Sequence, residues 1–170
     1  VGRFLADLLP SLRNAFETEE HRARRQAIED ELKERQEQAI GAVEAEAAER
    51  GVAVMRTPMG IAMAPLLDGR IMPPERFQEL PQEARAAIEA TIEGLQKRLQ
   101  QALADLPAWT KETRDRLRAL NDRTARVAVD YLVGPLLEAY ADLAPVHAHL
   151  DALRRDIVEH VEAFLQLPEQ

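Results

Sequence analysis

The chain has 170 residues, a size that fits one ordinary domain or one elongated helical element. Its net charge of −8 disfavours nucleic acid as a partner, because an acidic surface repels phosphate backbones. The absence of cysteine excludes disulfides and thiolate metal sites, and no apolar run approaches the ~20 residues of a membrane span. We therefore expect a cytoplasmic protein with neither a nucleic acid nor a membrane as its partner.

The composition indicates long helices. Aromatic residues make up only 4% of the chain and charged residues 31%, with much Ala, Leu, Glu and Arg. This combination is typical of long helices and coiled coils. The first residue is valine rather than methionine, and a helical pattern starts at once. We therefore expect a domain cut from a longer polypeptide.

The N-terminal part of the chain predicts two helices. Apolar residues recur at helical spacing over residues 3–16, where Pro10 should kink or break the helix. Thr18 is the predicted N-cap of a second helix that runs to Arg50, and Gly51 occupies its C-cap position. The apolar positions of this second helix form a narrow stripe, as in a two-stranded coiled coil.

Residues 52–72, which we call the β element, have a different pattern. Short β-type runs alternate with turn signals that include Pro58 and Asp68-Gly69. The runs predict three strands, at residues 52–56, 61–64 and 70–72. A small sheet of this kind is expected at the far end of a helical arm.

The C-terminal part returns to helical patterns. A heptad pattern covers residues 82–133, and Pro107 should kink it. The dipeptide Gly134-Pro135 should interrupt the pattern again. Two shorter helices are expected beyond it, at residues 136–143 and 145–165.

These elements predict a mainly α fold: a long antiparallel coiled-coil helical hairpin with a β-hairpin or three-stranded element at its tip and a helical base. Antiparallel pairing would place Leu32 near Leu99 and Val43 near Ile88. We expect a single helical domain over 1–170. Its predicted parts are a base (1–17 and 115–166), an arm (18–51 and 82–114) and a β-containing tip (52–81).

Motifs for catalysis or cofactor binding are missing from the sequence. The single serine, Ser11, is most simply an N-cap after Pro10, and the glycines do not have the spacing of a phosphate-binding loop. His147 and His149 are two residues apart, which places them on different faces of a helix and disfavours a metal site. We expect no catalytic, cofactor-binding or metal-binding residue in these 170 residues.

All four methionines of the chain fall in the β element, beside other apolar residues. One interpretation is a small core of the element itself. The other is a contact surface for a partner or an unfolded chain, because methionine is flexible and suits varied partners. Both can hold for different residues. The candidate contact residues are Met55, Met59, Ile61, Met63, Leu66, Ile71 and Met72.

Several motifs, in this order and spacing, resemble one group of bacterial proteases. They are AFETEEHRARRQAIE at 15–29, RTPMG at 56–60 with APL at 64–66, RLRALN at 116–121, YADL at 140–143 and VEHVEAF at 158–164. Together they resemble the helical region of Lon-like proteases of the LonC or LonB-like type. In these proteases a helical insertion interrupts an AAA+-like module.

The resemblance implies a helical domain of a cytoplasmic serine protease. The Ser–Lys dyad of that family lies outside this sequence, so no catalytic residue is carried over. The implied partners are the AAA+-like and protease domains of the parent, an unfolded polypeptide substrate, and further copies in a homo-oligomeric ring, expected to be hexameric. ATP stays open as a cofactor of the parent. We expect a non-catalytic accessory domain that gates or engages unfolded substrates; the alternative is a structural coiled coil for assembly or spacing only.

Overall fold

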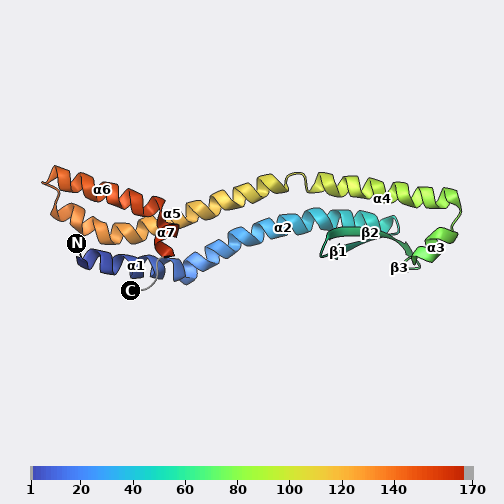
Figure 1. The fold of residues 1–170 in the computed structure, drawn as a ribbon, viewed down its shortest axis with the longest axis horizontal. Coiled ribbons are helices and arrows are strands. Elements are labelled where there is room, and N and C mark those ends of the chain that lie inside the picture. The colour runs from blue at the N-terminus through green and yellow to red at the C-terminus, as the bar shows by residue number, and fades with distance from the viewer. Residues whose placement is uncertain (1, 167–170) are drawn as a thin grey trace. The chain divides into compact units, whose positions relative to one another are not determined.

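The computed structural model describes the backbone of residues 2–166 and the side chains of residues 7–166. As predicted, the chain is mainly helical and contains one small antiparallel sheet (Figure 1). The described helices are α1 (Gly2–Glu17), α2 (Glu19–Glu49), α3 (Pro74–Glu79), α4 (Gln82–Ala102), α5 (Leu106–Ala139), α6 (Ala144–Glu159) and α7 (Val161–Leu165). The strands are β1 (Val52–Thr57), β2 (Gly60–Leu67) and β3 (Arg70–Ile71). Each helix in this range is too short or too polar to cross a lipid bilayer.

The chain divides into two compact units. The helical unit combines residues up to Asp30 with those from Lys111 onward. The β-containing unit spans Glu31–Thr110 and includes the sheet, α3, α4 and the C-terminal part of α2.

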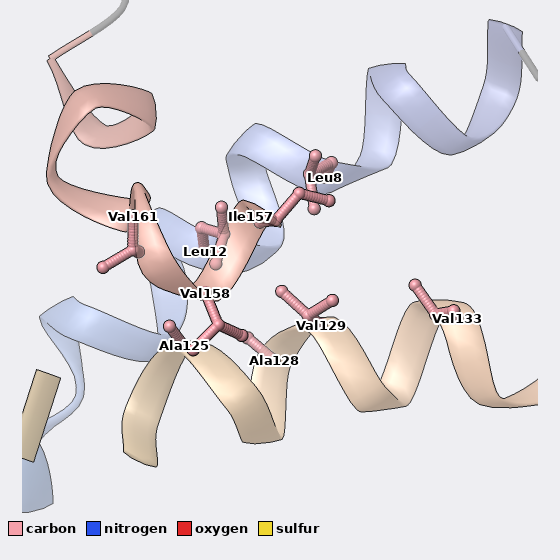
Figure 2. Packing of buried hydrophobic residues seen from close by; sticks show 9 residues of the cluster. All are labelled: Leu8, Leu12, Ala125, Ala128, Val129, Val133, Ile157, Val158 and Val161. Atoms are coloured by element: carbon pink, nitrogen blue, oxygen red, sulfur yellow. The ribbon is translucent and has the colours of Figure 1, made fainter. Parts of the chain in front are cut away.

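An aliphatic core holds the helical unit together. Figure 2 shows nine buried side chains, contributed by α1, α5, α6 and α7, that gather into one cluster. Leu12, Val129 and Val133 have no exposed surface at all. Burying one such side chain stabilises a fold by about 1.5–3 kcal/mol, so the aliphatic residues compensate for the scarcity of aromatic ones. The cluster comprises Leu8, Leu12, Ala125, Ala128, Val129, Val133, Ile157, Val158 and Val161.

The boundary between α1 and α2 has the predicted N-cap. The backbone amide of His21 donates a hydrogen bond to the Thr18 hydroxyl oxygen at 3.3 Å. That hydroxyl in turn donates to the carbonyl of Ala15 at 3.0 Å. Thr18 therefore satisfies one of the free amides at the start of α2 and also links the end of α1 to it.

Helix α1 is continuous through Pro10, so the predicted break does not occur. A proline inside a helix costs about 3 kcal/mol, because it removes a donor and crowds the preceding turn. Leu8 and Leu12 flank Pro10 and are both buried in the core of the helical unit. Their burial offsets the cost, since each fully buried leucine contributes a comparable amount.

The interruption predicted at Gly134-Pro135 is also wrong, because core residues pack on both sides of the proline. Helix α5 runs from Leu106 to Ala139 and includes both residues, so the separate helix expected at 136–143 is the end of α5. Val133 is fully buried and Leu137 packs against the same cluster. Core contacts on both sides of Pro135 keep the backbone helical.

At two other places the helices are divided more completely than the pattern predicted. The long heptad run is interrupted between Ala102 and Leu106, just before Pro107, where a kink was expected, and Pro107 lies in the first turn of α5. Proline is well suited to that position because the first helical amides have no partner within the helix. The predicted last helix also divides, at His160, into α6 and α7.

The sheet has the order β1-β2-β3, and both turns lie where the sequence predicted them. In the β1–β2 hairpin, Thr57 pairs with Gly60 across the Pro58-Met59 turn. In the β2–β3 hairpin, Asp68 and Gly69 both have positive φ, 51° and 76°. Two central residues with positive φ match the twist of a tight hairpin, and Asp-Gly is a favoured pair for this turn.

The register separates the two faces of the sheet. The inner face contains Val52, Val54 and Met63, which pack against Ala47 of α2 and against Ile92 and Leu95 of α4. Because side chains alternate along a strand, the intervening residues form the opposite, outer face. The outer face comprises Ala53, Met55, Thr57, Gly60, Ala62, Ala64, Leu66 and Ile71.

The observed contacts between α2 and α4 differ from the predicted register. Arg98 Nε lies 3.2 Å from Glu46 Oε2, and Leu95 shares a buried cluster with Ala47. The predicted pairing, for example of Val43 with Ile88, is offset from these contacts by several residues. The offset arises because β1 and β2 fold back along the helices and α3 follows them, so the connection is not symmetric about the β element. Coiled-coil packing over the full length of these helices stays a prediction.

Candidate functional site

The structure distributes the seven candidate contact residues over three places. Met63 belongs to the buried cluster on the inner face. Ile61 lies on the same face by strand alternation, and both are partly buried. Met72 follows β3, where its amide donates to the carbonyl of Pro65 at 2.8 Å. These three residues therefore fit the interpretation of a local core.

The outer face carries another three of the candidates. Met55 stands opposite Ala62, and Leu66 stands opposite Ile71, which is 50% exposed. Alanines occupy the middle of the face, with Met55 at one end and the Leu66–Ile71 pair at the other. Within β1–β3, all of which the structure describes, the outer face carries no charged side chain.

Met59, the seventh candidate, lies at the Pro58-Met59 turn and is 100% exposed. The Thr57 hydroxyl donates to the Gly60 carbonyl at 2.9 Å across this turn. A fully exposed side chain gains no burial energy in the isolated fold. Met59 is thus free to contact another molecule, and contact with a partner stays a prediction for it and for the outer face.

Charge is nearly absent from the hairpin itself. Arg56 is the only charged residue in β1 and β2, and its guanidinium lies 3.7 Å from a carboxylate oxygen of Glu44 in α2. An exposed pair of this kind contributes at most about 1 kcal/mol. An apolar ligand could therefore approach the outer face without displacing water from unpaired charges there.

The helical unit contains a buried histidine, His21, which was not singled out from the sequence. His21 is only 6% exposed, its Nδ1 atom lies 2.9 Å from the Thr124 hydroxyl oxygen, and its ring packs on Phe16 at 4.8 Å. Burial, and secondarily the charge of Arg25, lowers the pKa of His21. The imidazole is therefore held in its neutral form near pH 7. The position of His21 three residues after the Thr18 cap was the available signal, because it places the ring beside α1.

A cavity of about 330 Å³ opens next to His21. Its lining combines apolar and charged side chains, and the charges include Arg24, which forms an ion pair with Glu20 at 2.6 Å. None of the seven candidate contact residues lines it. The lining residues are Ala15, Thr18, Glu20, His21, Arg24, Leu120, Arg123, Thr124 and Val127.

Metal ligation has no geometric support in the part of the chain that the structure describes. Within it, no group of three or more His, Asp or Glu side chains is placed to hold an ion. His147 and His149 are both exposed in the first half of α6.

Comparison with protein-family models, with curated proteins and with solved structures found no match to this chain. The resemblance to Lon-like proteases therefore rests on the motifs quoted from the sequence. Two of those motifs fall in the hairpin: residues 56–60 form the end of β1 with its turn, and residues 64–66 lie in β2.

Proposed function

We propose that this chain is a non-catalytic accessory domain of a Lon-like serine protease, in which the β element engages unfolded polypeptide before degradation. The observation that carries the proposal is the exposure of Met59 and Ile71, which lie beside the half-buried Met55 and Leu66 of the apolar outer face. The sequence motifs supply the link to the protease family. The arrangement of the hairpin supports a contact role for it.

An unfolded chain is a suitable ligand for such a surface. Unfolded polypeptides expose apolar side chains that folded proteins bury, and a methionine side chain adapts to ligands of different shape. Burying about 200 Å² of apolar area would contribute roughly 5 kcal/mol before the entropic costs of association. The resulting affinity is weak, which allows a substrate to be released toward a protease site.

In this proposal the helices connect the β element to the AAA+-like and protease domains of the parent, which assembles into a homo-oligomeric ring, expected to be hexameric. The ring, the Ser–Lys dyad and any use of ATP belong to the parent. The chain described here contributes recognition rather than chemistry.

The test uses the full-length protease and a double variant, Met59→Gln with Ile71→Gln. Both side chains are at least half exposed, so neither change should unfold the sheet. We expect slower degradation of a permanently unfolded protein, with unchanged hydrolysis of a short fluorogenic peptide. The matched control is Val127→Gln with Tyr131→Gln, which replaces two exposed apolar residues of α5. Unchanged degradation by the first variant, with an intact ring, would exclude a substrate contact.

One observation favours the alternative, a structural role in assembly or spacing. Val127 and Tyr131 are 66% and 81% exposed and lie one turn apart on α5. An exposed apolar pair on one helix face is a plausible site for contact with another subunit. Loss of the ring on size-exclusion chromatography in the Val127→Gln/Tyr131→Gln variant would favour assembly through this face.

A further inference from the structure

Strand β1 lies at an edge of the sheet, and its hydrogen-bonding directions are fixed by its pairing. The amide of Leu66 donates to the carbonyl of Gly51 at 2.7 Å. Because these groups alternate along a strand, Ala53 and Met55 also direct their amides and carbonyls toward β2. The amides and carbonyls of Val52, Val54 and Arg56 therefore point away from the sheet, and within residues 2–166 no other strand pairs with them. Val52 is only 3% exposed, so the accessible part of this edge consists of Val54 and Arg56.

The edge of the sheet opposite β1 is covered only at residues 65–67, beside β3 and Met72, and the backbone groups of Ile61 and Met63 in β2 also point away from β1, with no strand of the described chain beside them. The β1 edge has no strand of residues 2–166 paired with it along its whole length. On the far side of β2, Pro65 lacks an amide hydrogen and its carbonyl accepts from Met72, next to β3. Natural proteins shield edge strands with prolines, lysines, bulges or covering segments. β1 has no proline, and its single charged residue, Arg56, is directed toward Glu44.

We propose that the outward edge of β1, formed by the backbones of Val54 and Arg56, binds an extended segment of unfolded polypeptide by strand addition. This inference rests on the proposed function and gives it a mode of recognition. Each outward residue offers one donor and one acceptor to an incoming strand. Main-chain pairing is independent of sequence, and alternate side chains of the segment would lie beside Ala53 and Met55 of the outer face.

The length of the edge favours a short segment over a second copy of this chain. β1 has six residues, whereas a stable dimer interface takes about 20–30 residues from each partner. A second copy would present the same outward residues, so pairing of two β1 edges would join only the short segments around Val54 and Arg56. An unfolded polypeptide has unpaired amides and carbonyls along its whole length, so it complements the free edge.

A pair of substitutions at Arg56 isolates the backbone contribution in the intact 170-residue chain. Arg56→Pro removes the outward amide and fills its place with the ring, but leaves the bonds between β1 and β2 intact because that amide does not point to β2. Arg56→Thr keeps the amide. Both variants lose the ion pair with Glu44. A difference in peptide affinity between them therefore measures the contribution of the outward amide at position 56.

The probe is a fluorescent extended peptide of about ten residues in which valine alternates with threonine. A second version is N-methylated at every other residue and so lacks the donors of one edge. We expect fluorescence anisotropy to show binding at least about tenfold weaker for Arg56→Pro than for Arg56→Thr. Wild-type protein should bind the N-methylated peptide about tenfold more weakly than the unmodified one, and the unmodified peptide should slow hydrogen exchange at the Val54 amide.

Three results would overturn strand addition. Equal affinity for both peptides and both Arg56 variants would indicate contact through side chains, which leaves the proposed function standing. Absence of peptide binding would exclude the edge as a site. Sedimentation of the free chain as a dimer, with the Val54 amide protected before peptide is added, would identify a second copy as the occupant. Conversely, if edge pairing is observed but both Arg56→Pro and Met59→Gln/Ile71→Gln leave degradation by the full-length protease unchanged, the edge site stands and the proposed function fails.

Discussion

Val54 stands directly opposite Met63 in the β1–β2 ladder, and both side chains pack against the buried cluster of Ala47, Val52 and Leu95. This pair fastens the hairpin to α2 and α4 through its inner face. The outer face and the Pro58-Met59 turn are left for other contacts. The division of roles between the two faces has measurable consequences.

The two methionines Met63 and Met59 should differ sharply in their effect on stability. Met63→Ser places a hydroxyl in the inner cluster and removes apolar contacts, and should cost about 1–3 kcal/mol of unfolding free energy. Met59→Ser changes a fully exposed side chain and should stay within about 0.5 kcal/mol of wild type. Urea unfolding followed by circular dichroism measures both values. Equal losses from the two substitutions would contradict the assignment of the faces.

The two glycines Gly69 and Gly94 should respond in opposite directions to alanine. Gly69 has φ +76°, a conformation that costs an alanine about 1 kcal/mol, so Gly69→Ala should lower the unfolding free energy. Gly94 lies inside α4 with no atom within 4 Å of an added Cβ, so Gly94→Ala should raise it by roughly 0.5–1 kcal/mol. The same urea experiment tests both, and a loss of stability in Gly94→Ala would show that α4 has closer neighbours than described.

Acid should destabilise the chain in part through His21. Its pKa in the folded chain is lowered, chiefly by burial and then by Arg25, whereas in the unfolded chain it titrates near 6.5. Between these two pKa values the unfolded state binds more protons, so the unfolding free energy falls as the pH falls. The stabilising effect of neutral His21 is therefore complete above about pH 7 and is lost as the pH drops through 6.5 toward the lowered pKa.

The measurement is the unfolding free energy between about pH 8 and pH 5 for wild type and for His21→Gln. We expect a smaller decrease with acid in the variant than in wild type. The control is His147→Gln, the same substitution at an exposed histidine. Identical slopes for wild type and His21→Gln would mean that His21 does not titrate differently on folding.

The features that local chemistry determines could be predicted from the sequence. Thr18 caps α2 because a hydroxyl at that position can accept from the amide three residues on. Gly51 has the positive φ, 68°, that ends a helix, and Asp68-Gly69 makes the expected tight turn. These signals located all three strands and the ends of α1 and α2 to within about one residue.

The features that depend on packing could not be predicted in the same way. Helix breaking by Pro10 and Pro135 was overestimated, because burial of Leu12 and Val133 is decided by distant segments of the chain. The register of α2 against α4 depends on how the hairpin folds back, which no short motif encodes.

The candidate site was predicted in its composition but not in its geometry. The methionine cluster pointed to the β element, yet only the strand pairing shows that Met63 faces inward while Met55 faces outward. The free edge of β1 also follows from strand order rather than from any motif. The scarcity of charged residues in β1 and β2 was the one sequence signal that could have suggested an unprotected edge.

The most direct test of the account is photo-crosslinking in the assembled full-length protease with its proteolytic serine inactivated. A photoreactive amino acid replaces Met59 in one variant and Tyr131 in another, because both side chains are highly exposed but lie in different units. With a permanently unfolded protein as substrate, we predict cross-links from position 59 and none above background from position 131. Absence of cross-links at position 59, or equal cross-linking at both positions, would contradict the claim that the β element engages unfolded polypeptide.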